Sequence, residues 1–262
     1  MTTGLTDRAL ATPGTMSDYS ATLTSVTHGY RDERGEELTA LEDLSLRVRR
    51  GRVLAVVGPS GCGKTTLLEL ICGLQQPAAG TIACQPAALM PQRDLLMGWL
   101  SALDNAALAL RIAGRSRAQA RLHAGALFAE FGLQGFERAK PHELSGGMRQ
   151  RVAFLRTLLS GKGLLCLDEP FGALDAITRQ QMQRWLIDAL RRQPRTVVLV
   201  THDVEEAILL GDELIVLSPR PGRVVAHLQV ALEHPRSHTD RRVVELRSRA
   251  LRSLTACQEA PR

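Results

Sequence analysis

The segment GPSGCGKTT, residues 58–66, constrains this chain more than any other part of its sequence. It lies between an apolar run, Val53 to Val57, and a run with helical character, Leu67 to Leu74. A strand, a glycine-rich loop and a helix in this order form a phosphate-binding P-loop. The glycines let the backbone curl around a phosphate chain, and N–H groups at the start of the helix face the anion. The segment predicts a nucleoside triphosphate site; the alternative is a glycine-rich turn with no ligand.

Lys64 and Thr65 are the side chains of this loop with the clearest chemistry. The chain has 30 Arg and only 3 Lys, and a compact ammonium fits between two phosphates where a planar guanidinium does not. The Thr65 hydroxyl is placed to bind Mg²⁺. The residues of the loop expected to contact the nucleotide are Gly58, Pro59, Ser60, Gly61, Cys62, Gly63, Lys64, Thr65 and Thr66.

Two adjacent carboxylates, Asp168 and Glu169, follow the apolar run Leu164 to Leu167. Such a run predicts a buried strand, and the carboxyl edge of an α/β sheet is where ligands bind. Asp168 is expected to hold Mg²⁺ through its water shell, and Glu169 to polarise the attacking water. The alternative is that the pair only caps the next helix.

Length and composition restrict the class of protein. A chain of 262 residues with 44% hydrophobic content predicts one large domain with an ample core. No apolar run approaches the roughly 20 residues that cross a bilayer. Residues 1–18 lack the apolar core of a signal peptide and are expected to form a flexible tail. Five Cys without metal-ligand spacing predict reduced thiols, and the protein is expected in the cytosol.

The net charge of +6 does not predict a nucleic-acid partner. From Ala226 to Arg262 there are seven Arg and four acidic residues, so half of the excess lies in that stretch. Aromatic residues make up only 3% of the chain, which leaves few platforms for base stacking. A solvated basic C-terminal tail over residues 226–262, or one that contacts anionic lipid, explains the charge better.

Apolar runs predict β and α segments at both ends of the chain and helices between them. The expected strands are Leu23–Val26, Ser45–Val48, Val53–Val57, Leu164–Leu167, Thr196–Val200 and Leu214–Leu217, the last three in a buried parallel sheet. The expected helices of the middle are Ala102–Leu110, Ser116–Phe131 and Gly147–Leu159, within a helical subdomain at about 93–158.

The segment LSGGMRQR, residues 144–151, places a hydroxyl and backbone N–H groups at the start of a helix, through Ser145, Gly146 and Gly147. Alone, this is an ordinary N-cap. Together with the P-loop and the LDEP segment it resembles the signature of ATP-binding cassette (ABC) ATPases, over about Leu23 to Val225. The resemblance implies an α/β P-loop NTPase fold: a RecA-like core with a parallel sheet, a small antiparallel β-subdomain and a helical signature subdomain, in one ATP-binding domain over 19–225.

The resemblance also implies further site residues. Tyr30 matches the aromatic that stacks on adenine, and Gln92 matches the Q-loop residue that senses the γ-phosphate and binds Mg²⁺. Asp175 ends the GALD segment, which matches the D-loop, and His202 matches the switch histidine, a catalytic residue with Glu169 and Lys64. Ser145, Gly146, Gly147 and Gln150 of the signature would contact ATP bound to a second copy of the chain.

Three further segments, FGALDAITR, THDVEEAILLGD and SPRPGRV, resemble the nitrate/sulfonate/taurine class of ABC importers. Residues 88–114 most resemble ATPases assigned to hydroxymethylpyrimidine, a thiamine precursor. The chain departs from the family at two places. Only 11 residues separate Gly80 from Gln92, which predicts a trimmed antiparallel subdomain, and Gly98 stands where a Pro before Trp99 is common.

The resemblance implies partners as well. Two copies are expected to pack head to tail, so that the P-loop of one and Ser145–Gly147 of the other enclose each ATP. The segment Arg93–Trp99, with apolar Leu95, Leu96, Met97 and Trp99, is expected to dock on an integral membrane permease. The assembly would include a periplasmic or surface solute-binding protein, with this chain peripheral at the cytoplasmic face of the inner membrane.

Two other functions stay open from the sequence. A soluble ABC ATPase of DNA repair or translation is one, although such proteins usually carry paired cassettes or long coiled coils. A P-loop kinase for a small molecule is the other, and it leaves LSGGMRQR and GALD unexplained. The transported solute is not determined by the sequence.

Overall fold

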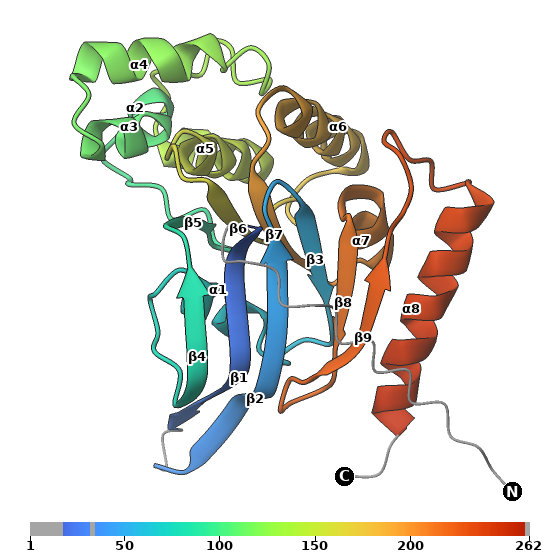
Figure 1. Ribbon diagram of the computed structural model, residues 1–262. Coiled ribbons are helices and arrows are strands. Elements are labelled where there is room, and N and C mark those ends of the chain that lie inside the picture. The colour runs from blue at the N-terminus through green and yellow to red at the C-terminus, as the bar shows by residue number, and fades with distance from the viewer. Residues whose placement is uncertain (1–17, 32–34, 260–262) are drawn as a thin grey trace, which may run out of the picture.

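The computed structural model describes residues 18–31 and 35–259, so the N-terminal tail expected over 1–18 lies outside the described residues except for Asp18. The strands are β1 (Tyr19–Arg31), β2 (Glu37–Arg49), β3 (Val53–Val57), β4 (Ala79–Cys84), β5 (Ala87–Met90), β6 (Leu164–Asp168), β7 (Thr196–Thr201), β8 (Glu213–Leu217) and β9 (Val224–Gln229). The helices are α1 (Lys64–Ile71), α2 (Ala102–Ala106), α3 (Leu108–Ile112), α4 (Arg117–Ala126), the 3-10 turn η1 (Pro141–Glu143), α5 (Gly146–Leu158), α6 (Ala176–Arg192), α7 (Val204–Leu210) and α8 (Arg241–Glu259) (Figure 1).

A six-stranded sheet in the order β5-β6-β7-β3-β8-β9 forms the centre of the fold, and its strands are parallel except for β9. Both faces are covered, which explains why its strands are continuous apolar runs. Along β6, Leu165 and Leu167 pack with the helices α2, α4, α5 and α6, whereas Leu164 and Cys166 pack with α1. Side chains that alternate between two cores exclude water from the strands.

A second, antiparallel sheet has three strands in the order β2-β1-β4. Helix α1 lies between the two sheets, because its buried residues Leu67, Leu68 and Leu70 share one core with Leu23 of β1 and Val198 of β7. β1 and β2 are much longer than the runs expected from the sequence, since they pair with each other over most of their 13 residues each. The small sheet thus presses the P-loop helix onto the parallel sheet.

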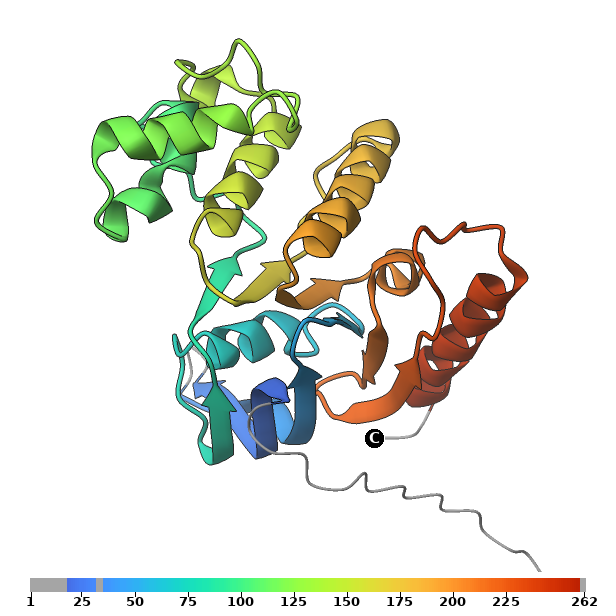
Figure 2. The ribbon, with the colours of Figure 1, turned by 45° about the horizontal axis from the view of Figure 1, so that its top comes forward.

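The central helices differ in their bounds from the expected ones. The helix expected over 102–110 is broken into α2 and α3 around Ala107, and the one expected over 116–131 ends at Ala126. α4 begins after Ser116, whose side chain and that of Gln119 form a capping box. Figure 2 shows α2 to α4 (green) grouped at one end of the molecule, and Phe128 and Phe131, after α4, pack in one core with Leu165 of the sheet.

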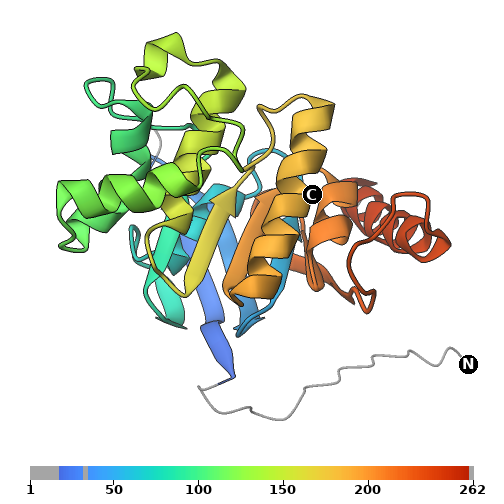
Figure 3. The ribbon, with the colours of Figure 1, turned by 90° about the horizontal axis from the view of Figure 1, so that it is seen from above.

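Residues 226–259 include a strand and a long helix, where the sequence predicted a basic tail over 226–262. The expected boundary at residue 225 falls inside β9, which pairs with β8. α8 packs on α7 through Val243 and Ala250, which are 1% and 0% exposed. Five of the seven arginines lie on α8, which also carries an apolar stripe, so the net charge did not reveal that this segment packs on the core. Seen from above, α8 (red) lies at the end opposite α4 (green) (Figure 3).

The mixed α/β architecture confirms the expected fold class. Within residues 18–31 and 35–259, none of the helices combines the length and apolar character needed to cross a bilayer.

Candidate nucleotide site

The loop from β3 to α1 is shaped by close contacts with β2. Gly63 precedes α1 with φ 96°, a left-handed conformation that other residues rarely adopt. A Cβ on Gly63 would lie 2.7 Å from Leu41 Cδ2 and 2.9 Å from the carbonyl oxygen of Ala40. Only glycine fits at this position, and the loop closes tightly over the start of α1.

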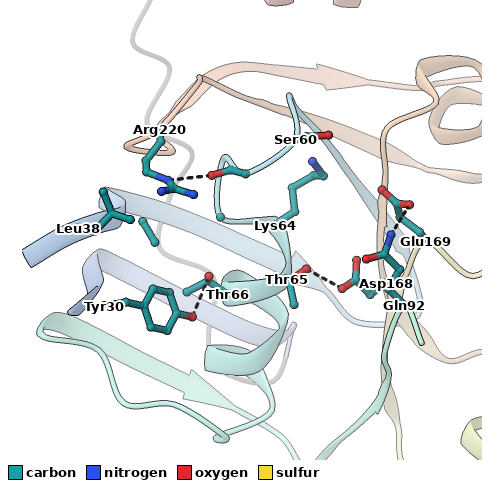
Figure 4. A pocket seen from close by; sticks show the side chains of 13 residues that line it. Tyr30, Leu38, Ser60, Lys64, Thr65, Thr66, Gln92, Asp168, Glu169 and Arg220 are labelled. Carbon is teal, nitrogen blue, oxygen red and sulfur yellow. Dashed lines mark hydrogen bonds between the residues drawn. The ribbon is translucent and has the colours of Figure 1, made fainter. Parts of the chain in front are cut away.

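A cavity of about 290 Å³ lies over this loop (Figure 4). Its walls come from segments that are far apart in the sequence: the β1–β2 hairpin, the P-loop, Gln92, the end of β6 and the turn after β8. The lining residues are Tyr30, Leu38, Ala40, Ser60, Gly61, Gly63, Lys64, Thr65, Thr66, Gln92, Asp168, Glu169 and Arg220.

Lys64 is 8% exposed, and its ammonium lies at the centre of the site. Nζ donates hydrogen bonds to the carbonyl oxygens of Gly58 at 2.8 Å and Pro59 at 2.9 Å. An ammonium has three N–H donors; these two bonds hold Nζ against the loop, and the third donor faces only the weak acceptor Cys62 Sγ at 3.9 Å, which an anion can replace. A buried cation beside the N-terminus of α1 makes this part of the cavity favourable for phosphate.

Thr65 and Asp168 meet at the other side of Lys64. The Thr65 hydroxyl donates to Asp168 Oδ2 at 2.7 Å, which places two oxygen ligands side by side. Burial raises the pKa of Asp168, the neighbouring Glu169 adds to this, and the Thr65 hydrogen bond and Lys64 act in the opposite direction. A cation bound here would remove the cost of burying this charge.

Glu169 follows Asp168 with a φ of 47°, an unfavourable backbone conformation for a residue other than glycine. Its Oε2 accepts a hydrogen bond from Gln92 Nε2 at 3.0 Å, and its Oε1 lies 3.0 Å from His202 Nδ1. Gln92, after β5, and His202, after β7, thereby hold the carboxylate of Glu169 at the edge of the cavity. His202 itself is exposed and does not line the cavity.

Tyr30 lies at the opposite end of the cavity from Glu169 (Figure 4). Its hydroxyl donates to Thr66 Oγ1 at 3.0 Å and is 3.4 Å from Glu69 Oε2, and its ring is 38% exposed. The edge of the ring packs on His28, with the ring centroids 5.1 Å apart. The ring is therefore fixed in position while part of it faces solvent.

The residues expected to act across a dimer lie outside this cavity. Ser145 caps α5, its Oγ accepting from Met148 N at 3.2 Å, and Asp175 caps α6, its Oδ1 accepting from Thr178 N at 3.0 Å. Gly146 is exposed and Gly147 is half-buried beside Leu174. Gln150 is 4% exposed, so this chain alone does not present it on the surface that carries Ser145.

The segment Arg93–Trp99 is only partly exposed. Leu95 and Trp99 are 59% and 74% exposed, whereas Leu96 and Met97 are half-buried, so the expected apolar cluster shrinks to two side chains. Arg156 of α5 donates to the carbonyl oxygens of Asp94 at 2.8 Å and Leu95 at 2.9 Å. These bonds connect the segment to α5, the helix that begins within the signature.

Sequence reasoning missed three residues of the cavity: Leu38, Ala40 and Arg220. Leu38 and Ala40 lie on β2, whose path over the P-loop no local pattern indicates. Arg220 belongs to SPRPGRV, which the sequence analysis used as a family resemblance and not as part of the site. The Pro-Gly pair that follows Arg220 is typical of a turn, and it was the signal in the sequence that could have drawn attention to this segment.

Comparisons with known proteins agree with this site. The model of the ABC transporter family matches residues 41–172. The chain is 44% identical over 193 residues to the formylaminopyrimidine import ATP-binding protein ThiZ of Halalkalibacterium halodurans, covering 72% of this chain and 78% of that protein. It is 46% identical over 200 residues to the taurine import ATP-binding protein TauB of Yersinia pestis bv. Antiqua, covering 73% and 78%.

Solved structures agree as well. The dimeric structure of MJ0796, a bacterial ABC transporter cassette, matches with a TM-score of 0.75 and 29% identity, covering 81% of this chain and 100% of that one. The dimeric structure of a post-hydrolysis state of that cassette bound to ADP and Pi matches over the same shares, with a TM-score of 0.74 and 28% identity. The site geometry, the family match and these relatives together establish that the chain belongs to the ABC transporter family.

Proposed function

We propose that this chain is the ATP-hydrolysing subunit of an ABC importer for a small solute. The observation that carries the proposal is the constellation in one cavity: a buried ammonium at a glycine-rich loop, a hydroxyl–carboxylate pair 2.7 Å apart and a second carboxylate held from two sides. The relatives named above are import ATP-binding proteins, which supports coupling of hydrolysis to uptake. No feature of the described residues favours DNA repair, translation or a kinase.

Mg²⁺ accompanies ATP in this proposal. No cluster of three acidic, His or Cys residues that could hold a metal exists among the described residues, which suits Mg²⁺, since this ion binds few protein groups together with substrate phosphates. Thr65 Oγ1, Asp168 and the amide oxygen of Gln92 would hold it. When bound, the ion neutralises charge that develops on the phosphates. Lys64 Nζ and the loop N–H groups stabilise the same charge electrostatically.

Glu169 is the residue that orients the attacking water. Its two oxygens are held by Gln92 and His202, so the carboxylate keeps one orientation at the end of the cavity nearest Asp168. His202 positions Glu169 and reaches the γ-phosphate when the site closes. Tyr30, at the other end, supports the adenine.

We further propose that two copies form the working unit. Ser145, Gly146 and Gly147 lie outside the cavity of their own chain, so we expect them to complete the site of a partner. Asp175 would lie at the same contact. The relative structure described as a dimer supports this arrangement. Because ATP would be held from both sides only in the closed dimer, its hydrolysis removes the contacts that favour closure.

The remaining partners follow from the import role. Exposed Leu95 and Trp99 are proposed to dock on a membrane permease, which places the chain at the cytoplasmic face of the inner membrane. A solute-binding protein outside the membrane would deliver the solute. Taurine and formylaminopyrimidine, named for the relatives, and hydroxymethylpyrimidine are the solutes to test.

Two experiments test the proposal. Purified protein should release phosphate from ATP only with Mg²⁺, and Lys64→Ala should abolish release because the phosphates lose their buried cation, while the exposed Lys162→Ala should not. Near-normal turnover by Lys64→Ala would remove the P-loop from the site. Uptake of each labelled solute by liposomes that contain this chain, its permease and its binding protein then identifies the solute; no ATP-dependent uptake of any solute would contradict an import role.

A further inference from the structure

Arg220 is the one charged residue among the three cavity residues, with Leu38 and Ala40, whose roles neither the sequence nor the proposed function explains. It lies in the turn between β8 and β9, and its Nε donates to the carbonyl oxygen of Gly61 at 3.1 Å. A Cβ on Gly61 would lie 3.3 Å from Arg220 Nη2, so the guanidinium lies directly on the P-loop. A second cation thus borders the loop that carries Lys64.

The turn that carries Arg220 is held firmly. Ser218 Oγ donates to the carbonyl oxygens of Pro219 and Pro221, both at 2.9 Å. Gly222 N donates to Ala40 O at 2.8 Å, and a Cβ on Gly222 would lie 2.1 Å from Cys62 O. The turn therefore packs against the P-loop backbone at two successive residues, and the backbone of Arg220 is in place before any ligand binds.

The charge of Arg220 has no counterpart within the described part of the chain. Among residues 18–31 and 35–259 no carboxylate lies within ion-pair distance of its guanidinium, and Gly61 O is its one acceptor. By contrast Arg223, three residues on, pairs with Glu42 at 2.7 Å. A guanidinium has five N–H donors, so both Nη groups of Arg220 remain free to donate toward an anion.

The cavity is electrically asymmetric. Figure 4 shows Arg220, Leu38 and Tyr30 on one side of the P-loop, and Asp168, Glu169 and Gln92 on the other. The acidic side suits a metal ion and the attacking water. If a nucleotide places its γ-phosphate on the acidic side and its base on Tyr30, its sugar and α-phosphate come to lie on the side of the P-loop that carries Arg220.

Building on the proposed function, we infer that Arg220 is a nucleotide-binding residue that donates to the α-phosphate and sugar side of the bound nucleotide. It adds ground-state affinity for ATP and ADP alike, because both carry that phosphate. It does not take part in the hydrolytic step, which lies at the opposite end of the cavity.

Three substitutions separate this role from simple support of the loop. Arg220→Met removes all donors and the charge, Arg220→Gln keeps a donor for Gly61 O without the charge, and Arg220→Lys keeps the charge. Arg223→Met is the matched control, since it removes an arginine of the same turn that pairs with Glu42 and lies outside the cavity. The Kd for ATP and for ADP is measured by calorimetry at two salt concentrations, with the melting temperature of each variant without nucleotide.

Arg220→Met and Arg220→Gln should weaken ATP and ADP binding equally, by roughly tenfold, and lower the salt dependence of the Kd, because a charge-assisted bond is lost. Arg220→Lys should recover part of the affinity, and the melting temperature without nucleotide should stay unchanged. If Arg220→Gln binds ATP and ADP with full affinity, the inference is wrong and Arg220 only supports the P-loop. If ATP binding is weakened but ADP binding is not, Arg220 does not lie beside the α-phosphate. Failure of the unaltered protein to bind ATP would instead contradict the proposed function.

Discussion

Among single residues of the site, Glu169 combines an unfavourable backbone conformation with hydrogen bonds that hold it in place. Its backbone conformation, with φ 47°, is costly by roughly 1–3 kcal/mol, and the surrounding structure must offset that cost. The hydrogen bond from Glu169 N to Val200 O, at 2.8 Å, and the two side-chain contacts to Gln92 and His202 provide that support. The strain orients the carboxylate away from the buried strand and toward the cavity.

His202→Ala should lower the rate of ATP hydrolysis by about 10²-fold and leave the Kd for ATP unchanged, since its contact with Glu169 matters for the reacting geometry and not for ATP binding. Phosphate release and ATP titration measure the two effects. His123→Ala, at an exposed histidine of α4, is the control. A purely structural histidine would give a lower melting temperature with a normal rate per folded molecule.

At the element scale, α6 and α7 are joined by a buried carboxylate. Glu206 of α7 is 5% exposed, and its Oε1 accepts from Gln183 Nε2 of α6 at 3.0 Å. Burial raises the pKa of Glu206, Asp203 adds to this, and hydrogen bonds from Thr201 and Gln183 act in the opposite direction. These helices begin at the D-loop and just after His202, so the pair links two parts of the site.

Glu206→Gln should therefore change how stability depends on pH. A raised pKa means that the folded protein holds this proton more tightly than the unfolded chain, so its stabilising effect is complete below the ordinary pKa of Glu and is lost as pH rises through the folded pKa. Unfolding in urea at pH 5, 6 and 7 measures the free energy of unfolding of Glu206→Gln and of the unaltered protein. As pH rises, Glu206→Gln should gain stability relative to the unaltered protein. Glu205→Gln, at the neighbouring surface carboxylate, should not reproduce this trend. If the free energies of unfolding of Glu206→Gln and of the unaltered protein differ by the same amount at every pH, the prediction is wrong.

The segment from Asp94 to Trp99 is held to α5 by the bonds of Arg156 to the carbonyl oxygens of Asp94 and Leu95, and Leu95 has a φ of 45°. Trp99→Ser should leave the ATPase activity of the isolated subunit intact, since Trp99 is 74% exposed and does not line the cavity. It should reduce co-purification with the permease and ATP-dependent uptake. Leu122→Ser, at an equally exposed side chain of α4, is the control. An unchanged complex with full transport would show that Trp99 only packs locally.

At the scale of the whole molecule, the separation of the cavity from Ser145–Gly147 predicts an ATP-dependent dimer. Glu169→Gln should bind ATP, dimerise and remain closed, because the amide cannot polarise water. Adding Gly147→Asp should prevent dimerisation, since two unit charges 4 Å apart repel by about 4 kcal/mol at an effective dielectric constant of about 20. ATP should still bind each chain.

Size exclusion or light scattering with ATP measures the dimer. Gly98→Asp in the Glu169→Gln protein is the control for an added charge, because its Cβ would meet nothing within 4 Å and it lies outside the signature. Equal dimerisation of the Gly147→Asp double variant and of Glu169→Gln alone would show that the signature does not face the nucleotide of a partner.

The chemistry of the P-loop and the strands of the parallel sheet could be predicted from the sequence. Lys64 and Thr65 follow a glycine-rich loop whose neighbours in the chain already form its strand and helix, so the local order contains the geometry. The runs of β3, β6 and β7 are apolar at successive positions because both faces are buried, and this pattern is visible without knowing what covers them.

The places where distant segments meet could not be predicted, because they depend on how the whole chain folds. Leu38 reaches the cavity because β2 crosses the P-loop, and Arg220 because the turn after β8 packs on Cys62 O. Arg220 lies 159 positions after Gly61, and a contact between such distant residues leaves no local period in the sequence. The position of α8 could not be predicted for the same reason. Its arginines predicted a solvated tail, whereas Val243 and Ala250 pack against apolar residues of α7 and β9. An apolar stripe on a helix is buried only where another surface covers it, and that surface exists only in the folded chain.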